Sequence, residues 1–241
     1  GVLREVVTNE LMKSGDESMA DKVIGGFAKM PLSQEKFQAL NGLYDPFVRV
    51  STREQLVKTT LVDRLSGRMG KVLDLACGSG TLAVLVKQKH SQLTMHGVDG
   101  DREMLGRAER KAAAAGVAVD FKYGMADALP YEDGSFDVVV SSLFFHHLTR
   151  AGKASAFAEI KRVLSPSGAL LLADWGRPQN MLMRVAFFPV RLLDGFTNTR
   201  DNVRGELSAL IRAAGFARTA KLADIATPLG TISILTAEVA A

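Results

Sequence analysis

The chain has 241 residues, of which 47% are hydrophobic and 23% charged, so it can bury the core of one large globular domain. Its 30 basic and 26 acidic residues leave a net charge of +4 without a block of like charges, which argues against a nucleic-acid-binding protein. The single cysteine excludes an intrachain disulfide and a cysteine-rich metal centre, and no apolar run approaches the length of about 18 residues that a membrane span needs.

The first part of the chain is predicted to lie outside the main fold. Residues 1–32 mix charge, glycine and methionine without a sustained period, so we expect a leader that is disordered or loosely held. They lack the pattern of a signal peptide, and we expect a cytoplasmic protein. Residues 33–66 have helical periodicity and predict helices that cap the domain. Ser51 is the expected N-cap of the second of these helices, which places three leucines on one face: Leu56, Leu61 and Leu65.

Strands and helices alternate from residue 71 onward, and with the cap helices they form a single domain, residues 33–241. The predicted strands cover residues 71–76, 93–99, 117–124, 136–144 and 169–175, and the helices cover residues 81–90, 101–116 and 151–164. A turn at 165–168, a helix at 201–215 and a closing hairpin near 217–225 and 230–238 complete the pattern. It predicts an α/β, Rossmann-like fold with a seven-stranded, mostly parallel sheet, an antiparallel last strand and helices on both faces.

Residues 175–200 form an insertion after the fifth strand. It carries more apolar side chains than an exposed loop tolerates: Met181, Met183, Phe187, Phe188, Leu192 and Phe196. We interpret the insertion as a lid over a bulky apolar acceptor, with Arg184 or Arg191 available for an acidic group. A core helix or a homodimer contact explains the same composition, and a surface that skims a membrane is a third alternative.

The segment VLDLACGSG, residues 72–80, predicts a ligand site. A buried strand ends there in a glycine-rich turn, and in a parallel sheet ligands bind beyond the carboxyl ends of the strands. Gly78 and Gly80 let a ligand approach the backbone at the N-terminus of the following helix. With Ala83 they satisfy the pattern G-x-G-x-x-A, and Asp99 follows at the spacing of a ribose-binding acid. The turn alone therefore fits both NAD and S-adenosylmethionine (SAM).

Three acids separate the two cofactors. Asp74 lies within the first strand, where a carboxylate attracts the ammonium group of SAM but repels a pyrophosphate. Asp99 ends the second strand, where it can accept both ribose hydroxyls, and Met104 can cover the adenine from the next helix. Asp127 follows the third strand and can accept the adenine amino group, which dinucleotide enzymes do not need. Together the three acids favour SAM.

These segments resemble the class I SAM-dependent methyltransferases over residues 33–238. VLDLACGSG resembles their glycine-rich first motif, GVDGDREML their acidic second loop, and ADALPYEDGSFDVVVSSLFFHHL their third and fourth motifs. The FHHL run and the LSPSG turn are similar to the ubiquinone/menaquinone C-methyltransferase-like branch. The first motif often has glycine where this chain has Ala76, whose small side chain still permits close approach. The resemblance implies a methionine subsite (Tyr44, Asp74, Ala76, Gly78, Gly80), a ribose and adenine subsite (Asp99, Gly100, Met104, Asp127, Ala128) and, near the sulfonium, Ser141 and Ser142.

Methyl transfer from a sulfonium is an in-line displacement that depends on alignment and on exclusion of water, so no nucleophilic side chain is required. His146 and His147 follow the fourth strand at the ligand edge and are candidate general bases. We predict no metal ligand set, and we expect a small or lipid-like, apolar acceptor whose methylated atom (O, C, N or S) stays open. A SAM-binding protein without methylation activity is the alternative, and an NAD-dependent oxidoreductase is a remote one.

Overall fold

The computed structural model describes residues 53–239. The predicted leader, the first cap helix, the Ser51 cap and Tyr44 lie outside the described residues. Seven strands form one sheet in the order β3-β2-β1-β4-β5-β7-β6, in which neighbours are parallel except that β7 runs antiparallel to β5 and β6. Their bounds are β1 Lys71–Leu75, β2 Thr94–Asp99, β3 Asp120–Tyr123, β4 Phe136–Ser142, β5 Leu164–Trp175, β6 Arg218–Thr227 and β7 Gly230–Glu238. The predicted fold class is confirmed.

The strand order reverses between β1 and β4, because β2 and β3 continue outward on one side and β5 on the other. Such a reversal is where ligands bind in open α/β sheets. β1 and β4 are paired from Val72 opposite Val138 to Leu75 opposite Ser141. The glycine-rich turn after β1 and the segment after β4 therefore leave the sheet side by side.

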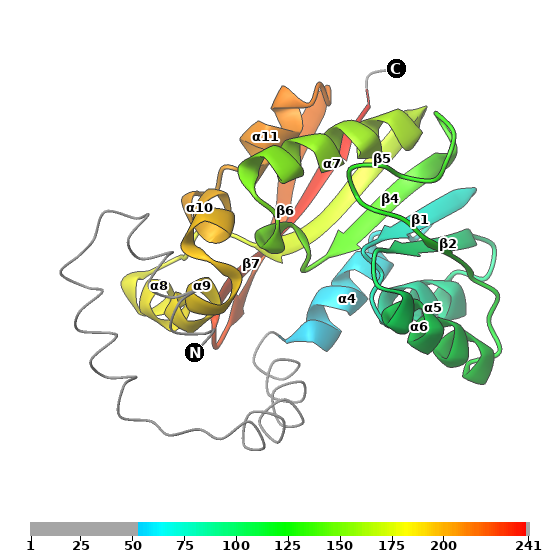
Figure 1. Ribbon diagram of the computed structural model, residues 1–241, viewed down its shortest axis with the longest axis horizontal. Coiled ribbons are helices and arrows are strands. Elements are labelled where there is room, and N and C mark those ends of the chain that lie inside the picture. Colours follow the sequence, from blue (N-terminus) through cyan, green and yellow to red (C-terminus); the bar gives the residue numbers. More distant parts are fainter. Residues whose placement is uncertain (1–52, 240–241) are drawn as a thin grey trace.

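Helices cover both faces of the sheet (Figure 1). On one face lie α4 (Glu54–Asp63), α5 (Thr81–Lys89) and α6 (Arg102–Ala114), and on the other α7 (Arg150–Val163) and α11 (Leu207–Ala213). Each face has its own cluster of buried apolar side chains, one around Leu61 and Val86 and the other around Phe157 and Ile211. This double burial explains why the central strands are continuous apolar runs in the sequence.

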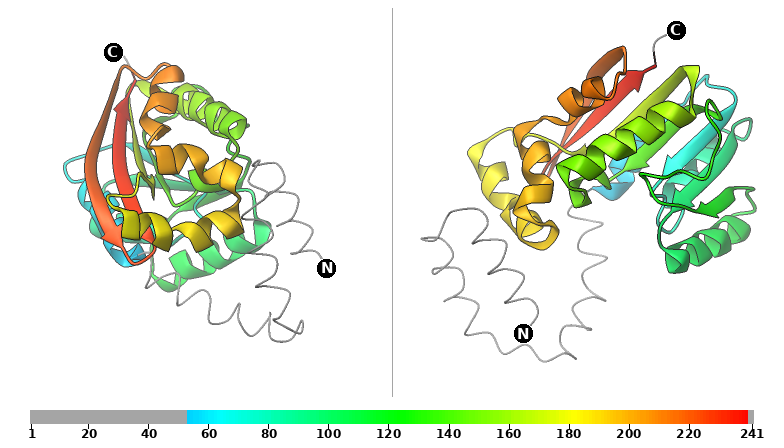
Figure 2. Two further views of the ribbon diagram at one scale, coloured as in Figure 1. Left: turned by 90° about the vertical axis from the view of Figure 1, so that its left-hand side faces the viewer. Right: turned by 45° about the horizontal axis from the view of Figure 1, so that its top comes forward.

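Three short helices lie at the end of the sheet where β5 finishes (Figures 1 and 2): α8 (Met181–Ala186), α9 (Phe188–Asp194) and α10 (Phe196–Arg204). α10 contacts β5 and η1 (Phe145–His147), the 3-10 turn that follows β4. Phe187, between α8 and α9, is 2% exposed and packs on Trp175. The core interpretation of the insertion therefore holds for Phe187. Other apolar side chains of the insertion are exposed: Met181, Leu182, Val185 and Leu193.

Residues of the second predicted cap helix form α4, and the predicted buried face is wrong in one position. Leu56 is 47% exposed, whereas Val57, Leu61 and Leu65 are buried. The buried side chains follow a spacing of four residues from Val57, which a helix places along one stripe. Leu56 precedes that stripe and faces solvent.

Two other predicted boundaries are wrong. The turn at 165–168 lies inside β5, where Phe136 pairs with Leu164 and Val138 with Ala169, so the four residues between form an irregularity of the strand. The predicted helix 201–215 is broken into α10 and α11 at Gly205, whose φ of 71° ends α10 in a left-handed residue. Within the described residues, no helix combines the length and the apolar character needed to cross a bilayer.

Substitution of Leu61 and Leu56 tests the assignment of the buried face of α4. Leu61→Ala removes a fully buried side chain and is expected to lower the free energy of unfolding by about 2–5 kcal/mol. Leu56→Ala, the matched control on the same helix, should change it by no more than about 0.5 kcal/mol. Urea denaturation of the two variants measures both values, and equal losses would contradict the assignment.

Candidate functional site

The turn after β1 is left-handed at three positions. Ala76, Gly78 and Gly80 have φ angles of 56°, 52° and 71°, and the N–H of Gly80 donates to the carbonyl of Cys77 at 2.9 Å. A Cβ added at Gly78 would meet no atom within 4 Å, whereas one at Gly80 would lie 2.8 Å from the Cβ of Ala108. Gly78 therefore borders open space at the ligand edge, and Gly80 lets α6 pack closely against the turn.

Ala76, which stands where the family motif often has glycine, is the strained residue of this turn. A left-handed conformation costs a residue with a Cβ about 1–2 kcal/mol, whereas glycine adopts it freely. The sequence interpretation weighed only the space that the side chain occupies. The backbone conformation gives the stronger reason for glycine at this position.

Asp99 organises the turn from the end of β2. Its Oδ2 accepts a hydrogen bond from the N–H of Gly78 at 2.7 Å, and its Oδ1 accepts one from the N–H of Asp101 at 2.9 Å. Each carboxylate oxygen has a further lone pair, so both can also accept from ligand hydroxyls. The structure thus brings the predicted ribose-binding acid and the glycine-rich turn together.

Asp74 is a buried acid with an unused oxygen. Its residue exposure is 2%, and its Oδ2 has no hydrogen-bond partner within the described residues. Burial raises the pKa of Asp74 to about 7, although the positive charge of Lys58 opposes the rise. An unpaired buried polar atom is costly, and a cationic group of a ligand would relieve that cost. The ammonium group of SAM meets this requirement.

The two serines at the end of β4 have different surroundings. Ser141 is fully buried and its hydroxyl donates to the carbonyl of Leu75 at 3.0 Å, so it ties the ends of β1 and β4 together. The Oγ of Ser142 is buried without a partner in the described part of the chain. Of the two predicted residues, Ser142 is therefore the one whose hydroxyl is available to a ligand.

The residues predicted to surround the adenine lie beyond the carboxyl ends of β2 and β3 and are largely exposed. Asp127 and Ala128 are exposed in the loop after β3, and Met104 is half-buried on α6. Gly100 follows β2, and a Cβ there would lie 2.9 Å from the Sδ of Met125. The sequence interpretation missed Met125, whose side chain is half-exposed next to Gly100.

The end of β5 carries a buried carboxylate that the sequence interpretation also missed. Asp174 is fully buried, and burial by itself would raise its pKa. His146 and backbone N–H groups instead hold the pKa of Asp174 below its ordinary value, so the side chain is ionised. Its oxygens accept from the backbone N–H groups of Phe144, Phe145, His146 and Trp175 and from the side chains of His146 and Asn202.

Both predicted histidines converge on one further acid. The Nδ1 of His146 lies 2.8 Å from Asp174, and its Nε2 lies 3.7 Å from the Oδ2 of Asp194. The Nδ1 of His147 lies 3.1 Å from the Oδ1 of Asp194, and this hydrogen bond raises the pKa of His147. Asp194 is the last residue of α9, so the insertion after β5 contributes directly to the ligand edge.

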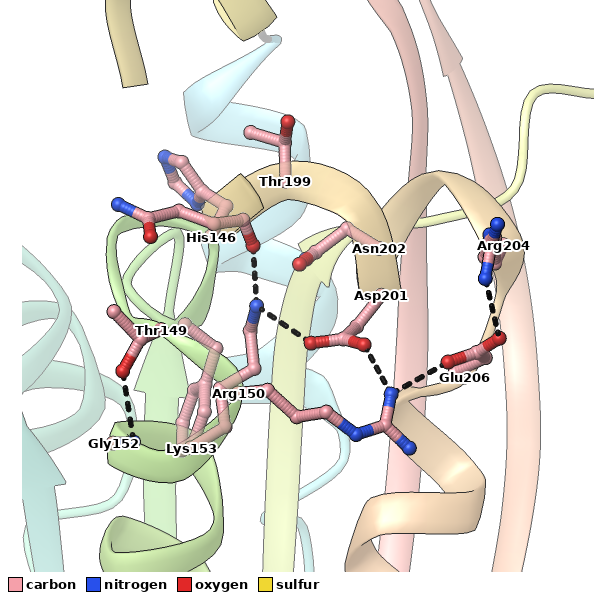
Figure 3. Close-up of polar contacts among 12 residues, drawn as sticks. His146, Thr149, Arg150, Gly152, Lys153, Thr199, Asp201, Asn202, Arg204 and Glu206 are labelled. Carbon is pink, nitrogen blue, oxygen red and sulfur yellow. Dashed lines mark hydrogen bonds and ion pairs between the residues drawn. The ribbon is translucent and has the colours of Figure 1, made fainter. Parts of the chain in front are cut away.

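A network of charged side chains fixes α10 against the start of α7 (Figure 3). Lys153 of α7 is fully buried and bonds to the carboxylate of Asp201, which also pairs with Arg150. Burial lowers the pKa of Lys153, and Asp201 opposes that shift. Asn202 follows Asp201 on α10, so the network also holds the amide that donates to Asp174 at 3.2 Å.

The sequence contained a signal for one of the missed residues. The segment LLADW, residues 171–175, has the same form as VLDLA, since an acid interrupts an apolar strand near its carboxyl end. Asp194 and Asn202 have no comparable signal. Their partners are far away in the sequence, 28 residues in the case of Asn202 and Asp174, and only the fold brings them together.

Comparison with known proteins finds a matching family model and similar curated proteins. Residues 72–168 match the model of a methyltransferase domain. An uncharacterized methyltransferase of Synechocystis is 34% identical over 149 residues, which cover 61% of this chain and 66% of that protein. A demethylmenaquinone methyltransferase of Deinococcus radiodurans is 32% identical over 157 residues, which cover 64% of each. The chain thus spans slightly less than two thirds of the length of these curated relatives.

The solved structures match the fold. The YcgJ protein of Bacillus subtilis is similar with a TM-score of 0.65, at 19% identity, over 78% of this chain and 99% of that chain. At this identity the likeness concerns the arrangement of strands and helices alone.

Replacement of Ala76 by glycine should stabilise the protein. Ala76→Gly removes the strain of a left-handed alanine and is expected to raise the free energy of unfolding by about 1 kcal/mol. Ala113→Gly, an exposed position in the last turn of α6, is the control and should lower it by up to about 1 kcal/mol, because glycine has a lower helix propensity than alanine. Opposite signs in urea denaturation support the assignment, and a loss in both variants would overturn it.

Proposed function

Because the chain carries a class I SAM-dependent methyltransferase domain of the ubiquinone/menaquinone C-methyltransferase-like branch, we propose that the protein transfers a methyl group from SAM to a small or lipid-like acceptor. One observation carries this proposal. As far as residues 53–239 show, a buried carboxyl group, Asp74, has an unpartnered oxygen, and the left-handed glycine turn that follows its strand borders open space. An ammonium group close to the backbone of that turn is what this arrangement fits.

The cofactor is proposed to lie along the carboxyl edge of β1, β2 and β4. Asp74 and the Gly78 turn would hold its methionine part, and Asp99 its ribose hydroxyls. Gly100, Met104, Asp127 and Ala128 would surround the adenine, and Ser142 is proposed to lie near the sulfonium. Ser141 supports this edge through its bond to Leu75. Tyr44 stays a prediction for the methionine carboxylate.

Methyl transfer from SAM requires no nucleophilic side chain of the protein. The methyl group of a sulfonium carries an activated leaving group, so the protein must align an acceptor atom behind it and exclude water. Positioning of this kind can supply about 7–11 kcal/mol of the barrier. The rigid strand ends and the helices α8 to α10 suit this task, because they lie at the same end of the sheet (Figure 2).

The acceptor is proposed to be apolar. Met181, Leu182, Val185 and Leu193 expose their side chains on α8 and α9, and one curated relative is a demethylmenaquinone methyltransferase. A lipid-like acceptor, such as a quinol, matches both observations. We expect no nucleic-acid partner, and a homodimer through these exposed side chains stays a prediction.

The general-base role of His146 and His147 stays a prediction. A base needs a nitrogen lone pair directed at the acceptor. The Nε2 of His146 and the Nδ1 of His147 are instead the nitrogens closest to Asp194. The two histidines lie at the acceptor end of the site, but their nitrogens face a carboxylate.

The activity is tested by incubating the purified protein with methyl-labelled SAM and reduced demethylated quinones, alongside a lipid extract, and identifying products by mass. We expect a product that carries one labelled methyl group. If the protein binds SAM but forms no methylated product, the proposal is contradicted and the alternative, a SAM-binding protein without methylation activity, is supported. Binding of NADH, but not of SAM or its demethylated product, would favour an oxidoreductase.

A pair of glycines provides a matched test of the cofactor site. Gly78 and Gly116 both have positive φ, 52° and 64°, and a Cβ at either would meet no atom within 4 Å. Substitution by alanine should therefore lower the free energy of unfolding by a similar amount at both positions, about 1 kcal/mol. Only Gly78→Ala should weaken SAM binding, by about tenfold or more in calorimetry, because its Cβ enters the proposed cofactor space. Equal affinities in the two variants would contradict the site.

The affinity for SAM should rise with pH through the pKa of Asp74. In the free protein that pKa is about 7, so the protonated form dominates below it, and binding of a cation releases the proton. Between pH 5.5 and 7 we expect the affinity to increase by roughly tenfold, measured by calorimetry. Asp74→Asn should bind more weakly at pH 7 and show no such slope, which separates this effect from titration of SAM itself. A slope retained in the variant would refute the assignment.

A further inference from the structure

His146, His147 and Asp194 place three ligand atoms around one point at the acceptor end of the site. The atoms all lie within 4.8 Å of one another, and within residues 53–239 no other group of three or more histidine, cysteine or acidic side chains does so. The Nε2 of His146 is 3.7 Å from one oxygen of Asp194, and the Nδ1 of His147 is 3.1 Å from the other. The set joins η1, which follows β4, to the end of α9.

These separations match those of metal ligands. A tetrahedral ion with bonds of about 2.0–2.1 Å to nitrogen and oxygen holds its ligand atoms about 3.3 Å apart. The two measured separations, 3.1 and 3.7 Å, lie on either side of this value. The two separations end on different oxygens of Asp194, and the three ligand atoms lie within 4.8 Å of one another, so the side chains would have to move by up to about 1.5 Å to complete the geometry.

Ring nitrogens of both histidines point at one carboxylate, that of Asp194. The Oδ1 of Asp174 accepts from backbone and amide N–H groups and lies 2.8 Å from the Nδ1 of His146, so this ring nitrogen is the one that donates to Asp174. In a neutral imidazole the Nε2 lone pair then faces the carboxylate of Asp194. His147 directs its Nδ1 at the same carboxylate. A metal ion between the two rings could bind one nitrogen of each and an oxygen of Asp194.

Asp174 supplies the support that metal-binding histidines commonly have. A metal-binding histidine usually donates its other ring N–H to a carboxylate or carbonyl, which fixes the tautomer and the orientation of the ring. His146 has this partner in Asp174, at 2.8 Å in a fully buried position. The second nitrogen of His146 is thereby presented to Asp194 in the form that binds metal.

The two segments that hold the ligands are also tied to each other. The Nδ2 of Asn198 donates to the carbonyl of His147 at 3.0 Å and to the carbonyl of Asp194 at 3.1 Å. The carbonyl of Asn198 in turn accepts from the buried amine of Lys153. These bonds hold the backbone of His147 near that of Asp194, and Figure 3 shows Lys153 with its partner Asp201 beside them.

We propose that His146, His147 and Asp194 form a binding site for a divalent transition-metal ion, of which Zn²⁺ is the type. Two imidazoles and one carboxylate are a ligand set that such ions prefer, and Mg²⁺ and Ca²⁺ prefer oxygen alone. Three protein ligands leave at least one coordination position for water or for an oxygen atom of a bound molecule. The proposal goes beyond the proposed methyl transfer and does not rest on it, because it concerns metal binding alone.

The site is tested with Co²⁺, which reports tetrahedral coordination through absorption in the visible range. The tag-free full chain is treated with a chelator, dialysed and titrated with CoCl₂, and then with ZnCl₂ in a calorimeter. We expect one equivalent of Co²⁺ with tetrahedral bands, displaced by Zn²⁺. Asp194→Asn and His147→Gln should each weaken binding by at least about tenfold, since each removes one ligand.

His96→Gln is the matched control. His96 and Asp120 form the other histidine–carboxylate pair at 3.1 Å, outside the proposed ligand set, so this variant should bind Co²⁺ as the wild type does. SAM binding and circular dichroism of every variant show whether it is folded, so a loss of metal in a folded variant is due to the ligand. Weak or non-stoichiometric Co²⁺ binding by the wild type would overturn the proposal, as would equal affinities in the wild type and both ligand variants.

Discussion

The arrangement of the segments that follow β4 and β5 depends on one buried carboxylate. Asp174 stands at the end of β5 without contact to water, and a charge at that depth persists only when charge-assisted hydrogen bonds replace the lost hydration. Its partners come from three places: the turn after β4, the backbone of its own strand and the amide of Asn202 on α10. The direction of the His146 ring and the position of α10 follow from this one side chain.

Asp74 and Asp174 show how the same residue type takes two roles in one sheet. Both interrupt apolar strands near their carboxyl ends, and both are buried. Donors surround Asp174, which holds its pKa below the ordinary value, so its charge is used within the protein. Among residues 53–239, one oxygen of Asp74 has no hydrogen-bond partner, and burial raises the pKa of Asp74 to about 7. Asp174 supports the fold, and Asp74 is proposed to bind a ligand.

The insertion after β5 is tied to the rest of the fold at two places. Phe187 anchors it in the core against Trp175, and Asp194 brings a carboxylate to the two histidines after β4. Asn198 and the buried Lys153 then set the spacing between these segments. These contacts join η1 and α9, the two segments that carry the proposed metal ligands.

The sequence determined the alternation of strands and helices, the mostly parallel sheet and the predicted cofactor edge. Apolar runs, glycine turns and acids at strand ends are local patterns, so they can be recognised without knowledge of distant contacts. Asp74, Gly78 and Asp99 are predictable for that reason. The break at Gly205, the exposed face of Leu56 and the strain at Ala76 are not, because each depends on a backbone angle or a neighbour that the pattern leaves free. Only the tertiary structure decided that His146, His147 and Asp194 meet. Their convergence requires a loop after β4 and a helix end nearly fifty residues later to pack around Asp174, and no local pattern encodes a contact of that range.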